Sequence, residues 1–140
     1  MIAPMQCPTY GVTLPCQLVE IRDGDTIVVA IRGMSLVWAI RLIDCWCPET
    51  NRGEEKLRKL GRAGSEYARQ VLHDGPNAGD LRVHIPLPEI AAGTEGVNLL
   101  SFLTFDRIPG YLYVGPHQTL NRLLVLAGLA SSTKGGPLGK

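Results

Sequence analysis

Hydrophobic and polar residues alternate in blocks between residues 15 and 44. The apolar segments PCQLVEI, TIVVAI and LVWAIRLI are separated by the polar segments RDGD and RGMS. An Asp-Gly pair between two segments rich in β-branched residues is a strong signal for a hairpin. The pattern therefore predicts a three-stranded antiparallel meander.

Two later segments carry the periodicity of amphipathic helices. Residues 45–56 are polar and contain Pro48, which ends the third strand. In residues 57–73 the apolar side chains with helical spacing are Leu57, Leu60, Tyr67, Ala68, Val71 and Leu72. Residues 117–130 show the same spacing at Leu120, Leu123, Leu124 and Ala127, with Gly128 near the end. We therefore expect two main helices.

Further apolar segments predict strands at residues 81–87, 97–105 and 108–115. Five or six short strands, with one helix after the third and another after the last, suit a small closed barrel better than a parallel sheet. The predicted fold class is thus mainly β with α: a five-stranded oligonucleotide-binding (OB) barrel with two main helices.

The chain length and composition fit one folded domain. The chain has 140 residues, of which 45% are apolar and 19% charged, enough for one core and too few for two comfortable domains. We expect an N-terminal extension at 1–14, the barrel domain at 15–131 and a flexible Gly-rich tail at 132–140. The formal net charge is +1, so any binding of nucleic acid must rest on local arginines.

The N-terminal segment and the apolar runs bear on localisation. No apolar run reaches the roughly 18–20 residues that a membrane helix needs, so we expect no membrane association. The first residues contain early prolines and no basic segment, which is a poor secretion signal. We expect a cytoplasmic protein, with secretion as the open alternative.

The four cysteines, Cys7, Cys16, Cys45 and Cys47, allow three interpretations. Free and mostly buried thiols are expected in a reducing cell. Two disulfides are the second interpretation. A four-sulfur zinc site is the third, although the spacing lacks the two Cys-x2-Cys pairs of the strong zinc pattern.

Four polar positions could support chemistry. Asp23 and Asp25 are two residues apart, which places both carboxylates on one side of an extended segment, as a hard cation requires; capping of the turn is the simpler alternative. Arg41 lies inside an apolar strand, so it needs either a neighbouring carboxylate or a bound phosphate. Arg107 could be a second phosphate ligand or could pair with Asp106 beside it.

In combination and in order, these segments resemble the staphylococcal nuclease (thermonuclease) family. The matching segments are DGDT at 23–26, RL at 41–42, PE at 48–49, GRAGSEYARQVL at 61–72, FDRIPGYLY at 105–113 and LNRLLVLAGLA at 120–130. The resemblance covers about residues 16–131. It implies an OB barrel with packed helices and hydrolysis of phosphodiester bonds in DNA and RNA, with Ca²⁺ as cofactor or with Mg²⁺ or another divalent ion instead.

The resemblance also implies a role for each matching residue. Asp25 corresponds to a metal-binding carboxylate, and Asp23 to an acid in the outer shell beside it. Arg41 and Arg107 correspond to the two guanidinium groups that hold the scissile phosphate. Glu49 corresponds to the residue that positions the attacking water.

Four positions depart from the family pattern. The family's second metal aspartate falls on Trp46, so we predict that Asp44, two residues earlier, supplies that carboxylate through a bulge. The alternative is a site that has lost a ligand. Cys47 can still offer its backbone carbonyl to the ion. Phe105 occupies the place of an aromatic residue that contacts substrate, and the aromatic residue expected after GLA falls near Lys134.

Two main functional hypotheses follow. The first is a metal-dependent nuclease that acts on single-stranded or denatured DNA or on RNA. The alternative is a catalytically impaired OB-fold module that binds nucleic acid or a protein partner, with Trp46 as a stacking surface. A structural zinc domain built from the four cysteines is a third hypothesis.

Overall fold

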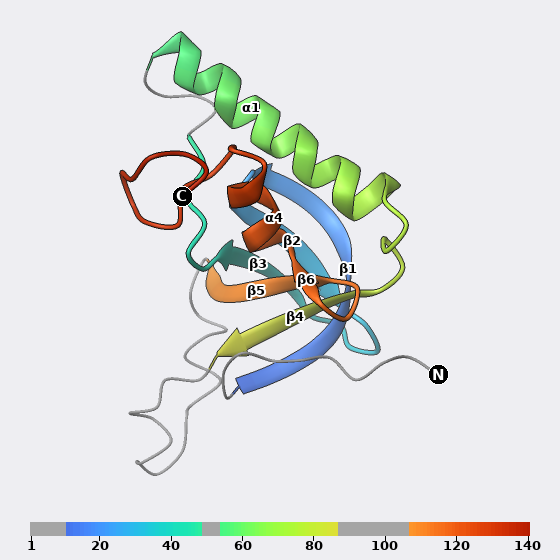
Figure 1. Cartoon of the computed structure of the whole chain (residues 1–140). Helices are drawn as coiled ribbons and strands as arrows, with labels where there is room; N and C mark the ends of the chain where they lie inside the picture. Colours follow the sequence, from blue (N-terminus) through green and yellow to red (C-terminus); the bar gives the residue numbers. More distant parts are fainter. Residues whose placement is uncertain (1–10, 49–53, 87–106) are drawn as a thin grey trace, which may run out of the picture.

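The computed structural model describes residues 11–48, 54–86 and 107–140 (Figure 1). Three sequence-based expectations lie outside these residues. They are the role of Glu49, the role of Phe105 and the strand predicted at 97–105. Within the described residues, no helix is both long enough and apolar enough to cross a membrane.

The predicted three-stranded meander is present. It comprises β1 (Gly11–Asp23), β2 (Thr26–Ile31) and β3 (Val37–Leu42). β1 pairs antiparallel with β2, and β2 with β3. β1 begins at Gly11 because its first half pairs with another strand, β4, from Gly11 to Cys16. β1 therefore includes residues 11–14, which the sequence pattern assigned to the N-terminal extension.

The barrel closes through strands that follow α1. β4 (Leu81–Pro86) pairs antiparallel with β1 and with β5 (Ile108–Val114). β5 then pairs parallel with β3, from Ile40 opposite Ile108 to Leu42 opposite Gly110. The short strand β6 (Gln118–Thr119) extends the end of β5. The predicted fold class is confirmed, because a closed five-stranded barrel of this kind, with one extra strand and two helices, is consistent with an OB fold.

The interior of the barrel is filled by aliphatic side chains from β2, β3, β4 and β5 and from α4. Fully buried examples are Ile27, Val29, Ile40, Leu42, Leu81, Val83, Leu112, Leu120 and Leu124. Burial of these side chains is the main stabilising contribution to the domain, at about 25 cal/mol per Å² of apolar surface.

The helices differ in length from their predicted ranges. α1 (Glu55–Arg69) continues into a short π-helical segment, η1 (Gln70–Asp74). α4 (Leu120–Leu126) is shorter than the predicted 117–130. It starts where the Thr119 hydroxyl accepts a hydrogen bond from the Arg122 N–H, and Gly128 adopts φ 77°, the left-handed conformation that ends helices.

Small residues on α1 allow it to approach the loop that follows β3. Gly61, Gly64 and Ala68 are its buried residues. A Cβ atom placed on Gly64 would lie 3.6 Å from the Cys47 Sγ atom. The helix therefore packs directly beside residue 47 and supports that loop.

The C-terminal segment folds back on itself. The backbone N–H of Ser132 donates to the Lys140 carbonyl at 3.0 Å, and that of Gly139 donates to the Ala130 carbonyl at 2.8 Å. Ser131 forms an isolated antiparallel bridge with Trp46. Residues 132–140, predicted as a flexible tail, thus form a hydrogen-bonded loop that is anchored beside the segment after β3.

Candidate functional site

The β1–β2 turn and the end of β3 lie side by side because of the strand register. Thr26 at the start of β2 is opposite Arg41 in β3, and the Leu42 N–H donates to the Asp25 carbonyl at 2.8 Å. This pairing brings the Asp25 carboxylate to 3.7 Å from the Arg41 guanidinium. Two residues that are sixteen positions apart in the sequence therefore form an ion pair at one end of the barrel.

Arg41 is largely enclosed, with its side chain 16% exposed. Its Nη1 atom donates to the backbone carbonyls of Leu42 and Cys45, the latter at 2.8 Å. Its Nη2 atom is buried and has no hydrogen-bond acceptor in the described part of the chain. Arg41 thus combines hydrogen bonds at Nη1 with an Nη2 group that faces the Asp25 carboxylate at 3.7 Å without a hydrogen bond in the described part of the chain.

Both carboxylate oxygens of Asp25 have partners. Oδ2 accepts from the backbone N–H of Cys47 at 3.1 Å. Oδ1 accepts from the Thr26 hydroxyl at 3.4 Å. The carboxylate is therefore held in one orientation, between the Arg41 guanidinium and the loop after β3.

The Trp46 indole stacks against two cations. The Arg41 Cζ atom lies 4.1 Å from the centroid of the ring, and the Lys134 Nζ atom lies 5.5 Å from it. Such contacts contribute about 0.5–2 kcal/mol each. The indole is 36% exposed, so it covers Arg41 and still presents surface to solvent.

An open cavity of about 460 Å³ collects most of the predicted site residues; we call it the arginine pocket. Its lining includes Asp23, Asp25, Arg41, Trp46, Cys47, Pro48, Arg107 and Lys134. Arg41, in β3, and Arg107, immediately before β5, open onto the same cavity. The structure therefore brings together the two arginines and the two aspartates that the sequence singled out.

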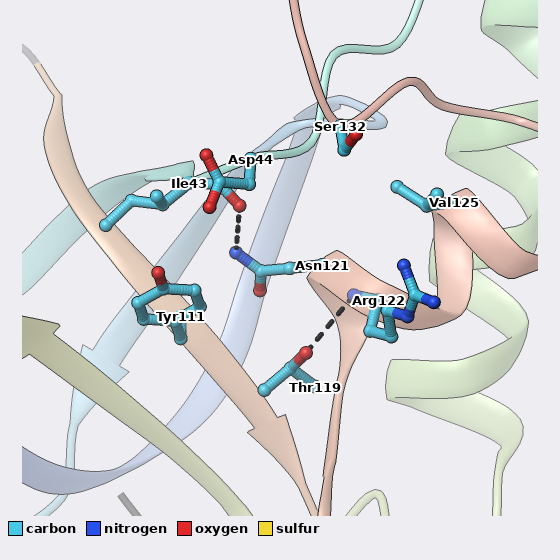
Figure 2. A pocket seen from close by; sticks show the side chains of 8 residues that line it. All are labelled: Ile43, Asp44, Tyr111, Thr119, Asn121, Arg122, Val125 and Ser132. Atoms are coloured by element: carbon cyan, nitrogen blue, oxygen red, sulfur yellow. Dashed lines mark hydrogen bonds between the residues drawn. The ribbon is translucent and has the colours of Figure 1, made fainter. Parts of the chain in front are cut away.

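Asp44 does not join this group. Its side chain lines a different cavity, together with Tyr111 and Asn121 (Figure 2). The reason is local: β3 ends at Leu42, and Asp44 adopts the left-handed φ of 53°. The strand alternation that would put residues 44 and 46 on one face no longer applies there. The expectation that Asp44 faces the same ion as Asp25 does not match this placement.

The described residues do not fit a calcium site by themselves. No group of three or more His, Cys, Asp and Glu side chains in residues 11–48, 54–86 and 107–140 is arranged to hold a metal ion. Calcium takes six to eight oxygen ligands. Asp25 and Asp23 line the arginine pocket, but the position of the family's second aspartate is occupied by the apolar ring of Trp46.

The described cysteines are free thiols. Cys16 and Cys45 are fully buried in the core, and Cys47 lines the arginine pocket. Cys47 shares a hydrogen bond with Cys45, which together with burial raises the pKa of the Cys47 thiol far above its usual value. The thiol therefore stays protonated, and it is a poor nucleophile and a poor metal ligand in this state.

Two features of the site were not predicted as functional. Lys134 lies in the Gly-rich tail, where no local pattern distinguishes it from any other exposed lysine. The stacking of Trp46 on Arg41 was also missed, although a tryptophan in place of a metal aspartate was a signal for it. Comparison of the chain with protein-family models found no match, and neither did comparison with curated proteins.

Proposed function

We propose that the arginine pocket binds a backbone phosphate of single-stranded or denatured DNA or of RNA, and that the chain hydrolyses phosphodiester bonds there as a nuclease of the staphylococcal type. The observation that carries this proposal is the position of Arg41 and Arg107 on one cavity, beside the carboxylates of Asp25 and Asp23.

Several charges support the binding of phosphate. The Nη2 group of Arg41 is buried and lies 3.7 Å from the Asp25 carboxylate, yet it makes no hydrogen bond in the described part of the chain. A phosphate oxygen would supply the acceptor that this buried donor lacks. Arg107 is exposed immediately before β5, where its planar guanidinium can form paired hydrogen bonds with phosphate oxygens. Lys134 adds a third positive charge to the same pocket.

The same groups support hydrolysis. Negative charge accumulates on the equatorial oxygens when water attacks the phosphorus atom. Fixed guanidinium groups stabilise that charge without reorganising. Asp25 keeps the Arg41 guanidinium oriented through their ion pair. The resemblance implies a divalent ion facing Asp25 and Asp23. Because the described residues do not complete a site for it, no step of the reaction is assigned to that ion.

The second candidate is an OB-fold module that binds nucleic acid without cleaving it. The observation that favours it is the exposed indole of Trp46 between two cations. Aromatic side chains beside basic groups are the usual stacking platform for single strands. This candidate uses the same pocket, so only an assay for cleavage distinguishes the binding module from the nuclease.

The test is an assay with an end-labelled single-stranded DNA and the matching RNA, in Ca²⁺, in Mg²⁺ and in EDTA. Cleavage that falls by about a hundredfold or more in Arg107→Ala supports the nuclease, because loss of one transition-state donor has that effect. Binding without cleavage supports the module. Arg62→Ala, on the exposed surface of α1, is the matched control. The absence of both binding and cleavage would contradict the proposal.

A further inference from the structure

A second cavity, the Tyr111 pocket, lies between the end of β3 and α4. It encloses about 440 Å³, within the usual range for small-molecule sites. Its lining includes Ile43, Asp44, Tyr111, Arg122, Val125 and Ser132. Figure 2 shows Tyr111 and Arg122 on opposite sides of Asn121, which forms the floor between them.

The two cavities use the same two chain segments. The segment after β3 contributes Asp44 to the Tyr111 pocket and Trp46 to the arginine pocket. The segment after α4 contributes Ser132 to the first and Lys134 to the second. The bridge between Trp46 and Ser131 joins these segments. A chain-like ligand held in the arginine pocket therefore has a neighbouring cavity beside it.

Most of the polar atoms in the floor of the Tyr111 pocket are already engaged. The Asn121 amide donates to the carbonyls of Ile43 and Gly110, at 2.9 Å and 3.1 Å, and accepts from the Leu112 N–H at 3.0 Å. The Thr119 hydroxyl accepts from the Arg122 backbone N–H. These groups shape the cavity and do not select a ligand.

Two charged side chains of the pocket remain available. Neither the Asp44 carboxylate nor the Arg122 guanidinium has a hydrogen bond or ion pair with the described part of the chain, and both residues are exposed. Burial and the nearby charge of Asp44 raise the pKa of the Tyr111 hydroxyl. The phenol therefore stays neutral, and its ring is an uncharged face against which a planar group can stack.

On the basis of the proposed function, we infer that the Tyr111 pocket binds the base next to the phosphate held in the arginine pocket, with a preference for guanine. An ionised carboxylate only accepts hydrogen bonds and has two oxygens. Guanine is the base that presents two adjacent donors on its pairing edge, and its adjoining Hoogsteen edge presents two acceptors, O6 and N7, that suit an arginine. Asp44, Arg122 and the Tyr111 ring supply the corresponding partners.

The test compares single-stranded thymidine oligonucleotides of equal length that carry one central guanine, adenine or cytosine. Their affinities are measured by fluorescence anisotropy in EDTA, with an all-thymidine strand as reference. We expect the guanine strand to bind at least about fivefold more tightly than the others. Two hydrogen bonds from one side chain to a base edge favour the correct base over the wrong one by about this factor or more. Asp44→Asn should abolish this preference, so that the guanine strand binds no more tightly than the others. Glu20→Gln, at an exposed position of β1, is the matched control.

Failure of this inference is distinguishable from failure of the proposed function. Equal affinity for all four strands, with binding still lost in Arg107→Ala, would overturn the guanine preference alone. If no strand binds, the proposed function fails, and guanosine itself is then titrated while the backbone and side-chain NMR signals of Tyr111 are followed. Shifts that disappear in Asp44→Asn support the pocket, and the absence of shifts overturns it.

Discussion

The guanidinium of Arg41 lies over the indole of Trp46, with the Cζ atom 4.1 Å from the ring centroid. In the family that the sequence resembles, the position of Trp46 holds a metal aspartate. Compared with that pattern, Trp46 contributes an aromatic surface over Arg41 in place of a carboxylate. The first prediction follows from this exchange.

Trp46→Asp should increase the affinity of the protein for Ca²⁺ by about tenfold or more, because a second close carboxylate strengthens an oxygen-ligand site. Isothermal titration of Ca²⁺ into both proteins measures the change. Trp46→Asn removes the indole without adding charge and should show no such gain. Equal Ca²⁺ affinity in the Asp and Asn variants would contradict the prediction.

The two arginines of the pocket should differ in their effect on stability. Arg41→Ala leaves two backbone carbonyls without their donor and Asp25 without its counter-ion. We expect a loss of about 2–4 kcal/mol in the free energy of unfolding. Arg107→Ala changes an exposed residue and should cost less than about 0.5 kcal/mol. Urea denaturation of the two variants provides the comparison. If Arg41→Ala lowers the free energy of unfolding as little as Arg107→Ala is expected to, Arg41 has no structural role.

Asn121 should be a major determinant of stability. Its buried amide joins α4 to β5 and to the segment after β3 through three hydrogen bonds. Asn121→Ala should lower the free energy of unfolding by about 2–4 kcal/mol, because buried backbone groups lose their partners. Gln118→Ala, at an exposed position nearby, should stay within about 0.5 kcal/mol of the wild type. A change of similar size in both would argue against this role.

Cys16 should make the protein less stable at alkaline pH. Burial raises the pKa of its thiol to about 12, with Arg32 opposing the shift. The folded state thus keeps a proton that the unfolded state releases above pH 9. The stabilisation is complete below pH 9 and is lost as the pH rises toward 12, by up to about 1.4 kcal/mol per pH unit.

Thermal unfolding of the wild type and Cys16→Ala under reducing conditions, from pH 8 to 11, measures this contribution. The variant should lose stability with pH less steeply, because one titrating group is gone. Parallel curves for the two proteins would mean that Cys16 does not titrate differently in the folded state.

Local sequence signals determined much of the fold. The Asp-Gly turn and the β-branched runs placed β1, β2 and β3, because hairpin pairing depends on neighbouring residues and on a period of two. Apolar residues at helical spacing placed α1, because this signal also depends only on neighbouring residues. The order of Asp23, Asp25, Arg41 and Arg107 also indicated one site, and the hairpin register brings Asp25 and Arg41 together as a direct consequence.

Other features depended on contacts between distant segments. The parallel pairing of β3 with β5 closes the barrel and brings Arg107 to Arg41, yet no short-range pattern encodes a pairing across more than sixty residues. The direction of Asp44 depended on one left-handed φ after the strand had ended. Lys134 reaches Trp46 only because the C-terminal segment folds back through the Ser131 bridge.

The amino-acid sequence by itself therefore indicated β1 to β5, the two helices and the types of charged group available for chemistry, since these follow from local periodicity and residue type. Tertiary structure decided which of those groups share a cavity. The physical reason is that side-chain direction changes completely with a single backbone angle, and that barrel closure is set by the summed burial of residues far apart in the chain.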